Sequence, residues 1–448
     1  MIERIGLSGN RLRVLALIFL IGLKVIYAAI TPFSLDLFAW IRMGSGILSG
    51  TLFQGVYTAP AYIYAGTYAL WLLATKDATA LNRVIESYSP YTPGPRIVII
   101  PIDQFVFTLF MKIPMLVADI ATMFALSIIT TKLTGSSRKG MVAALLWASS
   151  PLVFLAEMIN TVEVFPALLI LLGVYSIHQS KLKSGSLFLA IGSILRLAPL
   201  LFSWIYLIAF LRLRQIKNLV TFVVIHLALF ASGLFLASYV AGVSPVQVAE
   251  DLLSGRPGVL VSEVLSSLGL FITPRIGYNP YGLGANLTLY VLIGYLLTKQ
   301  AAWKNRSIGA EALILLAGYF ALTSYSPQFL LWMVPIFIVY SVVTRFGSKY
   351  FLLTSWLGFV MIAVLESQYL SGYQKAVFLI PTMNAVMVSL SVALYRLYSL
   401  VMIPILVRSL FSAFLLFLIL WIVREMIQSS RQSNVSMSPE PSAIAQER

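Results

Sequence analysis

Residues 106–130 read VFTLFMKIPMLVADIATMFALSIIT, and residues 131–140 read TKLTGSSRKG. The first stretch is apolar for longer than the roughly 20 residues that a helix needs to cross a bilayer. The second contains Lys132, Arg138 and Lys139 but no acid, and basic loops of membrane proteins stay in the cytoplasm. Together they predict a membrane-spanning helix that runs from the outer face of a membrane to the cytoplasm.

The composition of the whole chain agrees with this interpretation. Of its 448 residues, 59% are hydrophobic and 10% are charged, whereas a soluble globular domain has roughly 25% charged residues. Such a chain cannot cover a water-facing surface with polar side chains, so we expect an all-α polytopic membrane protein. Its net charge of +15 then predicts basic cytoplasmic loops, and no nucleic-acid partner is expected.

The scarcity of cysteine and histidine excludes several kinds of chemistry. The chain has no cysteine and two histidines. It therefore cannot have disulfide bonds, thiolate zinc sites, iron–sulfur clusters or a cysteine nucleophile, and a histidine-based metal centre is not expected. The sequence also lacks phosphate-binding and dinucleotide-binding glycine motifs, so it shows no means of using a cytoplasmic nucleotide.

The apolar runs predict about eleven membrane-spanning helices in a single domain over residues 1–428, followed by a disordered polar tail over residues 429–448. Basic residues before the first run place the N-terminus in the cytoplasm. Arg408 leaves the number of crossings open in the last run. The expected spans are residues 12–30, 106–130, 141–156, 165–178, 219–241, 283–298, 308–324, 328–344, 350–366, 376–395 and 397–423.

Between the spans we expect two large extracytoplasmic loops, over residues 31–105 and 242–283. The first contains an apolar run, residues 61–75, that is too short to span comfortably and is expected to lie at the membrane interface. Most of the acidic residues fall in predicted outer loops or at outer helix ends. Carboxylate chemistry is therefore expected on the extracytoplasmic face.

A re-entrant segment is expected over residues 186–211. This stretch is apolar, but basic residues flank it on both sides. It is too short to cross twice, and a single crossing would place one basic flank outside. A pair of half-helices, broken near Arg196 and Pro199, satisfies both conditions.

Asp36 and Arg196 are candidates for chemistry. Asp36 lies among Leu, Phe and Trp residues, where desolvation makes a carboxylate a better base, or it caps the helix that follows. A guanidinium at membrane depth needs an anion, so Arg196 binds a lipid phosphate or pairs with an acid such as Asp119. Lys24 and Lys112 lie near helix ends and could snorkel to the interface.

Asp119 follows Lys112 by seven residues, so both lie on nearly one face of their helix. An acid within a span is either functional or part of a helix-locking ion pair. Arg256, in an outer loop rich in Gly and Pro, could reach a phosphate or be a solvated charge. Tyr57 and the neighbouring aromatic residues could stack on sugars or belong to the interfacial aromatic belt.

Several short motifs occur in the order that is typical of GT-C membrane glycosyltransferases. Over about three quarters of its length, the chain resembles the PIG-M-like, polyprenyl-phosphate-mannose-dependent mannosyltransferases most. The resemblance rests on the common order of seven short motifs along the chain. The matching segments are Asp36 through Gly50, Tyr57-Thr58-Ala59-Pro60, Lys112-Ile113-Pro114 with Asp119, Ser150-Pro151 with Asn160-Thr161-Val162-Glu163, Arg196-Leu197-Ala198-Pro199, Arg256, and Ser326-Pro327-Gln328-Phe329-Leu330-Leu331-Trp332.

The resemblance implies inverting transfer of a hexose, with mannose as the expected sugar, from a polyprenyl-phosphate sugar. The acceptor would be a glycan, a glycolipid or a protein at the extracytoplasmic face, and membrane lipids are further partners. Asp36 is expected to be the catalytic base. The remaining assignments are Arg196, Arg256 and Lys112 for the donor phosphate, and Tyr57, Asn160, Glu163 and Gln328 for the sugar or acceptor.

The chain departs from the family pattern at three positions, which are Ser34, Arg196 and Ser326. Ser34 stands where the family carries the first acid of an Asp-x-Asp motif, so the single Asp36 does not support a divalent metal, and no other cofactor is expected. Arg196 stands where Lys is common, and Ser326 stands where a His often precedes Pro-Gln.

Two other functions remain open. A lipid-sugar flippase or secondary transporter would use the same broken segment and buried charges for alternating access, but the long outer loops favour a fixed outer-face site. A non-catalytic scaffold subunit is the third possibility.

Overall fold

The computed structural model describes the chain in several ranges, and every regular element within them is a helix. The predicted all-α fold class is therefore confirmed for this part of the chain. The described ranges are residues 9–30, 35–49, 59–87, 102–153, 162–195, 203, 206–207, 210–211, 214–241, 244, 327–344, 352–353, 355–357 and 413–424.

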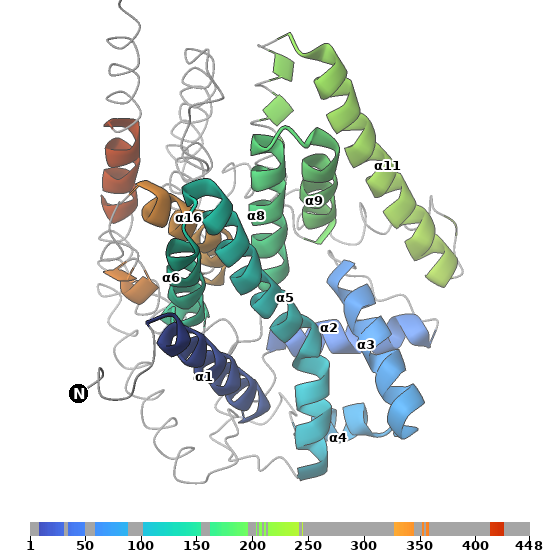
Figure 1. Ribbon diagram of the computed structural model, residues 1–448. Helices are drawn as coiled ribbons and strands as arrows, with labels where there is room; N and C mark the ends of the chain where they lie inside the picture. The colour runs from blue at the N-terminus through green and yellow to red at the C-terminus, as the bar shows by residue number, and fades with distance from the viewer. Residues whose placement is uncertain are drawn as a thin grey trace, which may run out of the picture.

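Figure 1 shows how the labelled helices are arranged around α5. They are α1 (Gly9–Ile30), α2 (Leu35–Leu48), α3 (Ala59–Thr75), α4 (Ala80–Ser87), α5 (Ile102–Thr134), α6 (Ser137–Ala148), α8 (Val164–His178), α9 (Leu182–Leu195), α11 (Ile216–Ala241), the 3₁₀-helix η3 (Pro327–Trp332) and α16 (Val334–Thr344).

Two stretches of helix are long and apolar enough to cross a membrane, Val106–Thr134 in α5 and Ile216–Gly233 in α11. The helices expected over residues 12–30 and 165–178 are present as α1 and α8. The predicted spans at residues 283–298, 308–324 and 376–395 lie outside the described residues, so the expected number of crossings is not tested.

Proline changes the expected boundaries of two helices. The helix expected over residues 141–156 is interrupted, because α6 runs from Ser137 to Ala148 and residues 151–153 are helical again. Pro151 disfavours helical geometry at the residue before it, which explains the end of α6. The span expected over residues 328–344 begins instead as the 3₁₀-helix η3, and α16 starts next to Pro335.

α5 also contains a proline, Pro114, within its helical length. Proline removes one intrahelical hydrogen bond and its ring clashes with the preceding turn, so it bends a helix. Figure 1 shows α5 changing direction partway along its length. The two halves of α5 consequently contribute to two different cores.

The first core, called the α2–α3 core here, surrounds the first half of α5. Its members are buried apolar side chains. They include Trp40, Ile41, Tyr64, Tyr68, Trp71, Phe107, Met111, Met115 and Val162. α2 lies across the direction of α5 in Figure 1 and packs closely on α3, where a Cβ atom on Gly44 would lie 2.6 Å from the backbone nitrogen of Ala65.

The second core, called the α5–α8 core, surrounds the second half of α5 and includes residues from α6, α8, α16 and the helical segment 413–424.

α8 and α9 form a hairpin. Its turn ends α8 with Ser180 at φ 60°, and the backbone nitrogen of Lys181 donates to the carbonyl of Ser176 over 2.9 Å. This pattern closes a helix by satisfying its last carbonyls. Gly173 and Gly185 let the hairpin helices approach closely, since a Cβ atom on Gly185 would lie 2.9 Å from the Gly173 carbonyl oxygen.

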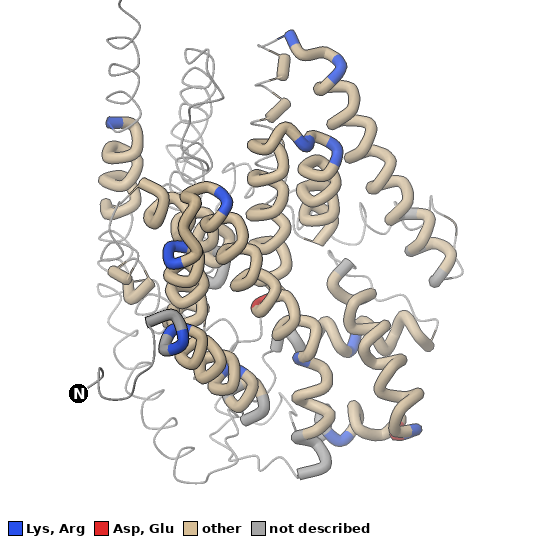
Figure 2. The backbone as a smooth tube through the Cα atoms, viewed as in Figure 1, with Lys and Arg blue, Asp and Glu red and all other residues tan. Residues whose placement is uncertain are grey.

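Many charged residues lie near the ends of the described helices, and α1, α2 and α5 also carry charged residues partway along their length (Figure 2). The basic α8–α9 turn and the basic start of α11 lie toward the top of the view, and the α3–α4 connection, which contains Asp77, lies at the bottom. Between these ends, α1, α5 and α11 carry large exposed apolar side chains, among them Phe19, Val117 and Phe235. Such faces are suited to lipid contact.

Candidate functional site

A network of buried polar side chains joins α1, α5 and α6. The Nζ atom of Lys24 lies 2.7 Å from Oδ2 of Asp119, and each of these side chains is 1% exposed. The indole nitrogen of Trp147 donates to the other carboxylate oxygen, Oδ1, over 2.6 Å. Burying a charge is costly unless a counter-ion and hydrogen bonds compensate it. Here a cation and an indole donor satisfy the Asp119 carboxylate together.

Lys112, one of the predicted phosphate ligands, makes a second contact between α5 and α1. Its Nζ atom donates to the backbone carbonyl of Ala28 over 2.7 Å. α1 ends at Ile30, so the Ala28 carbonyl is one of the last four in the helix and has no intrahelical partner. A cation at this position also interacts favourably with the helix dipole. Lys112 therefore caps the C-terminal end of α1.

These contacts align α1 and α5 in opposite directions. Lys24 meets Asp119, and Ala28, one turn later on α1, meets Lys112, which is earlier on α5. The spacing argument that put Lys112 and Asp119 on one helix face is confirmed, because both contact α1. The five residues Lys24, Ala28, Lys112, Asp119 and Trp147 are called the junction network below.

The structure corrects one prediction for these lysines and gives Asp119 its partner. The suggestion that Lys24 and Lys112 snorkel to the interface is wrong, because both are 1% exposed. The cation that pairs with Asp119 in the described part of the chain is Lys24, so Asp119 already has a counter-ion. The sequence alone had left Arg196 as a possible partner.

Glu163, a predicted sugar or acceptor ligand, is buried at the start of α8. Its side chain is 0% exposed, and its Oε2 atom accepts a hydrogen bond from the indole nitrogen of Trp332 over 2.7 Å. Trp332 ends η3, the segment that carries Gln328. The contact therefore fastens the beginning of α8 to the Pro-Gln-aromatic-Leu-Leu-Trp motif, 169 residues further along the chain.

The predicted base, Asp36, is the second residue of α2. Trp40, one helical turn later, belongs to the α2–α3 core, which also contains Met111 and Val162. These two residues are the direct neighbours of Lys112 and Glu163 in the sequence. Three predicted site residues thus lie within four residues, along the sequence, of members of one buried cluster.

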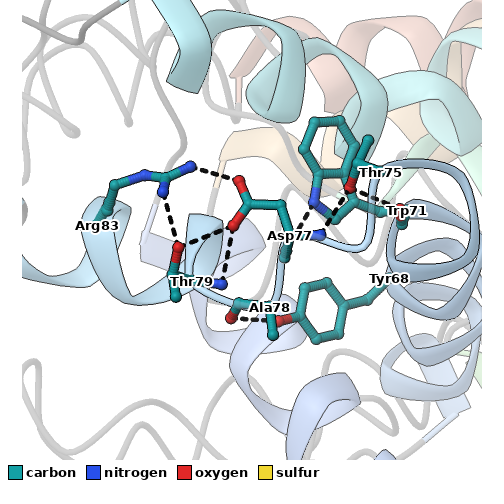
Figure 3. A network of polar contacts seen from close by, with 7 residues as sticks. All are labelled: Tyr68, Trp71, Thr75, Asp77, Ala78, Thr79 and Arg83. Carbon is teal, nitrogen blue, oxygen red and sulfur yellow. Dashed lines mark hydrogen bonds and ion pairs between the residues drawn. The ribbon is translucent and has the colours of Figure 1, made fainter.

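The α3–α4 connection holds a polar network that the sequence did not predict (Figure 3). The Asp77 carboxylate accepts hydrogen bonds from the backbone nitrogen and the hydroxyl of Thr79, over 3.0 and 2.8 Å, and pairs with Arg83. The Trp71 indole and the Tyr68 hydroxyl donate to the backbone carbonyls of Asp77 and Ala78. The Thr79 hydroxyl, with Arg83, holds the pKa of Asp77 below its ordinary value.

Other predicted site residues lie beyond these contacts. Tyr57, Asn160, Arg196 and Arg256 are outside the described residues, as is the expected break of the re-entrant segment at residues 196–202. For Asp36 and Gln328 the structure gives the helix but not the side chain. Within the described ranges, no group of three His, Asp or Glu side chains could hold a metal ion.

The sequence did not predict the partners of Trp147 and Trp332, although Trp332 belongs to a motif quoted above. Each of these two tryptophans donates a hydrogen bond to a buried carboxylate. Their partners are 28 and 169 residues away. No local signal could have identified them. No protein-family profile, curated protein or solved structure matches the chain.

Proposed function

We propose that the protein is a multi-pass membrane glycosyltransferase that moves a hexose from a polyprenyl-phosphate donor to an acceptor at the extracytoplasmic face. The observation that carries this proposal is the α2–α3 core. Trp40 on α2, Met111 on α5 and Val162 before α8 are members of this one cluster, and in the sequence they lie within four residues of Asp36, Lys112 and Glu163, respectively. The motif order in the sequence assigns the latter three residues to the same site.

The distribution of charge supports the placement of this site on the extracytoplasmic face of the membrane. The α8–α9 turn and the start of α11 carry cations and no acid and lie toward one end of the helices, whereas the α3–α4 connection at the other end carries Asp77 together with Lys76 and Arg83 (Figure 2). Basic ends belong in the cytoplasm. The end with the α3–α4 connection, close in sequence to α2, then faces outward, where a lipid-linked donor can enter laterally from the bilayer.

In the proposed reaction, Asp36 accepts the proton of the acceptor hydroxyl while the oxygen attacks the anomeric carbon of the donor. The bond from that carbon to the phosphate oxygen breaks, and the polyprenyl phosphate leaves with the bonding electrons. One such displacement inverts the anomeric configuration. Arg196, Arg256 and Lys112 stabilise the negative charge that grows on the phosphate.

The junction network gives Lys112 a defined place in this scheme. The Nζ atom of Lys112 caps the Ala28 carbonyl. Lys112 thus lies at the end of α1, from which the chain leads into α2 and Asp36. Tyr57, Asn160, Glu163 and Gln328 are the proposed contacts to the sugar and acceptor, with Glu163 also bound to Trp332.

Asp36→Asn tests the assignment of the base. We expect the purified full-length variant to transfer hexose about 10²–10⁴-fold more slowly, because general base assistance is typically worth that factor. The assay supplies a small panel of polyprenyl-phosphate hexoses and acceptors. Asp77→Asn, in the same outer region, is the matched control and should retain activity. Near-wild-type transfer by Asp36→Asn would reject the assignment.

A lipid-sugar flippase is the second candidate, and the buried Lys24–Asp119 pair favours it. Ion pairs within membrane-spanning helices are a common element of transport pathways. A flippase would move the labelled lipid-linked sugar between the leaflets of proteoliposomes without forming a glycosylated product. That result, with no transfer to any acceptor, would replace the glycosyltransferase proposal.

A further inference from the structure

Two neighbouring helices, α9 and α11, begin with exposed cations. Lys181 and Lys183 lie at the start of α9, and Arg214 and Lys217 lie at the start of α11. The start of α11 lies above the α8–α9 turn, toward the same end of the view, in Figures 1 and 2, and α9 packs against α11. The chain from residue 179 to residue 218 contains no acid. These four cations are called the basic rim below.

The side chains that follow the basic rim are apolar and also exposed. Leu187 lies one helical turn after Lys183, and Val220 and Val224 lie one and two turns after Lys217. Residues three or four positions apart share a face of a helix. On α11, therefore, an exposed lysine lies directly above an exposed apolar stripe, and on α9 an exposed lysine lies directly above a single exposed leucine.

This combination matches the chemistry of a phospholipid. The acyl chains need an apolar surface that is not covered by protein, and an anionic headgroup needs cations at the end of that surface. Long lysine side chains can rest their methylene groups on the apolar stripe and keep the ammonium at headgroup level. A free anion would use the cations but would gain nothing from Leu187, Val220 or Val224.

We propose that the basic rim and the exposed apolar side chains below it bind anionic phospholipids of the cytoplasmic leaflet. Their phosphate groups contact Lys181, Lys183, Arg214 and Lys217, and their acyl chains lie along α9 and α11. This site is distinct from the proposed transfer site, because the α3–α4 connection lies at the opposite end of the described helices. It does not depend on the glycosyltransferase proposal.

Lipid titration of the purified full-length protein tests the site. Phosphatidylglycerol or phosphatidylcholine is added to the protein in a mild neutral detergent, and the thermal unfolding midpoint is recorded. We expect phosphatidylglycerol to raise the midpoint more than phosphatidylcholine does. In the variant K181Q/K183Q/R214Q/K217Q this preference should fall, with at least a roughly tenfold loss of affinity, because each cation near an anionic membrane contributes roughly fivefold.

Three controls make the result decisive. K76Q removes an exposed cation at the opposite end of the described helices and should keep the preference for phosphatidylglycerol. K181R/K183R/K217R keeps the charge and should also keep the preference. Soluble glycerol phosphate should have no comparable effect. An unchanged preference in the four-fold glutamine variant, no preference in the wild type, or an equal effect of glycerol phosphate would each overturn the proposal.

Discussion

The Nζ atom of Lys24 lies 2.7 Å from the Oδ2 atom of Asp119, and the two side chains are almost completely buried. Neither charge can reach water, so each depends on the other. Three helices converge at this pair, since Trp147 of α6 binds the same carboxylate. The predictions begin with this contact.

Asp119→Asn should destabilise the protein by about 3–5 kcal/mol, because it leaves a buried ammonium without its counter-ion. Asparagine keeps an oxygen that can accept from Trp147, so the loss reports on the ion pair. The double variant K24M/D119N should recover most of the stability, since it buries no unpaired charge. Thermal unfolding in detergent measures both. Equal stability of the single and double variants would show that the charges are not coupled.

Lys112→Met should lower stability by about 1–3 kcal/mol even without donor or acceptor, because the buried Ala28 carbonyl loses its hydrogen-bond donor. Thermal unfolding of the protein without substrates measures the effect. Lys76→Met, which removes an exposed lysine, is the matched control and should change stability by less than about 0.5 kcal/mol. If Lys112 served the donor phosphate alone, the two variants would unfold alike.

Gly44→Ala should destabilise the contact between α2 and α3 by about 1–3 kcal/mol, because the new methyl group has no room. Its Cβ atom would lie 2.6 Å from the backbone nitrogen of Ala65, and backbone cannot move aside as a flexible side chain can. Gly66→Ala on α3 is the matched control. No heavy atom lies within 4 Å of its new Cβ, so we expect stability to rise by up to about 1 kcal/mol from helix propensity. Similar midpoints for the two variants would contradict the tight packing.

The α3–α4 connection should loosen in acid. The pKa of Asp77 is held below its ordinary value of 3.8, so its hydrogen bonds contribute fully at neutral pH and are lost as the pH falls through the lowered pKa. Hydrogen exchange of residues 76–87, corrected for intrinsic rates, should show protection at pH 7 that disappears in strong acid. Asp77→Asn should show the weakened protection already at pH 7. Protection that does not depend on pH would contradict the role of the carboxylate.

The sequence predicted the helices better than their contacts, for a physical reason. The length of an apolar run and the charges beside it are local properties, and they located α1, α5, α8 and α11. The shared face of Lys112 and Asp119 followed from helical spacing. Where a proline interrupted a run, as at Pro151, the expected boundary was wrong.

Pairing between distant helices depends on tertiary packing, which no local pattern encodes. Lys24 and Asp119 each stood out as a charge in an apolar run, but the spacing within either helix could not match them with each other. The same applies to Glu163 and Trp332, which meet across 169 residues. For the site, the sequence supplied candidates, and the fold supplied the partners of Lys112, Asp119 and Glu163.

The separation of Lys24 and Asp119 also matters during biosynthesis. The two residues are 95 positions apart, and at roughly 5–20 residues per second a ribosome needs about 5–20 s to make that length of chain. For a protein inserted into a membrane as it is made, the first helix would enter with an ammonium whose counter-ion has not yet been translated. Until α5 emerges, the Lys24 ammonium would have to interact with the insertion machinery or with lipid headgroups. Asp119 would then replace these temporary partners.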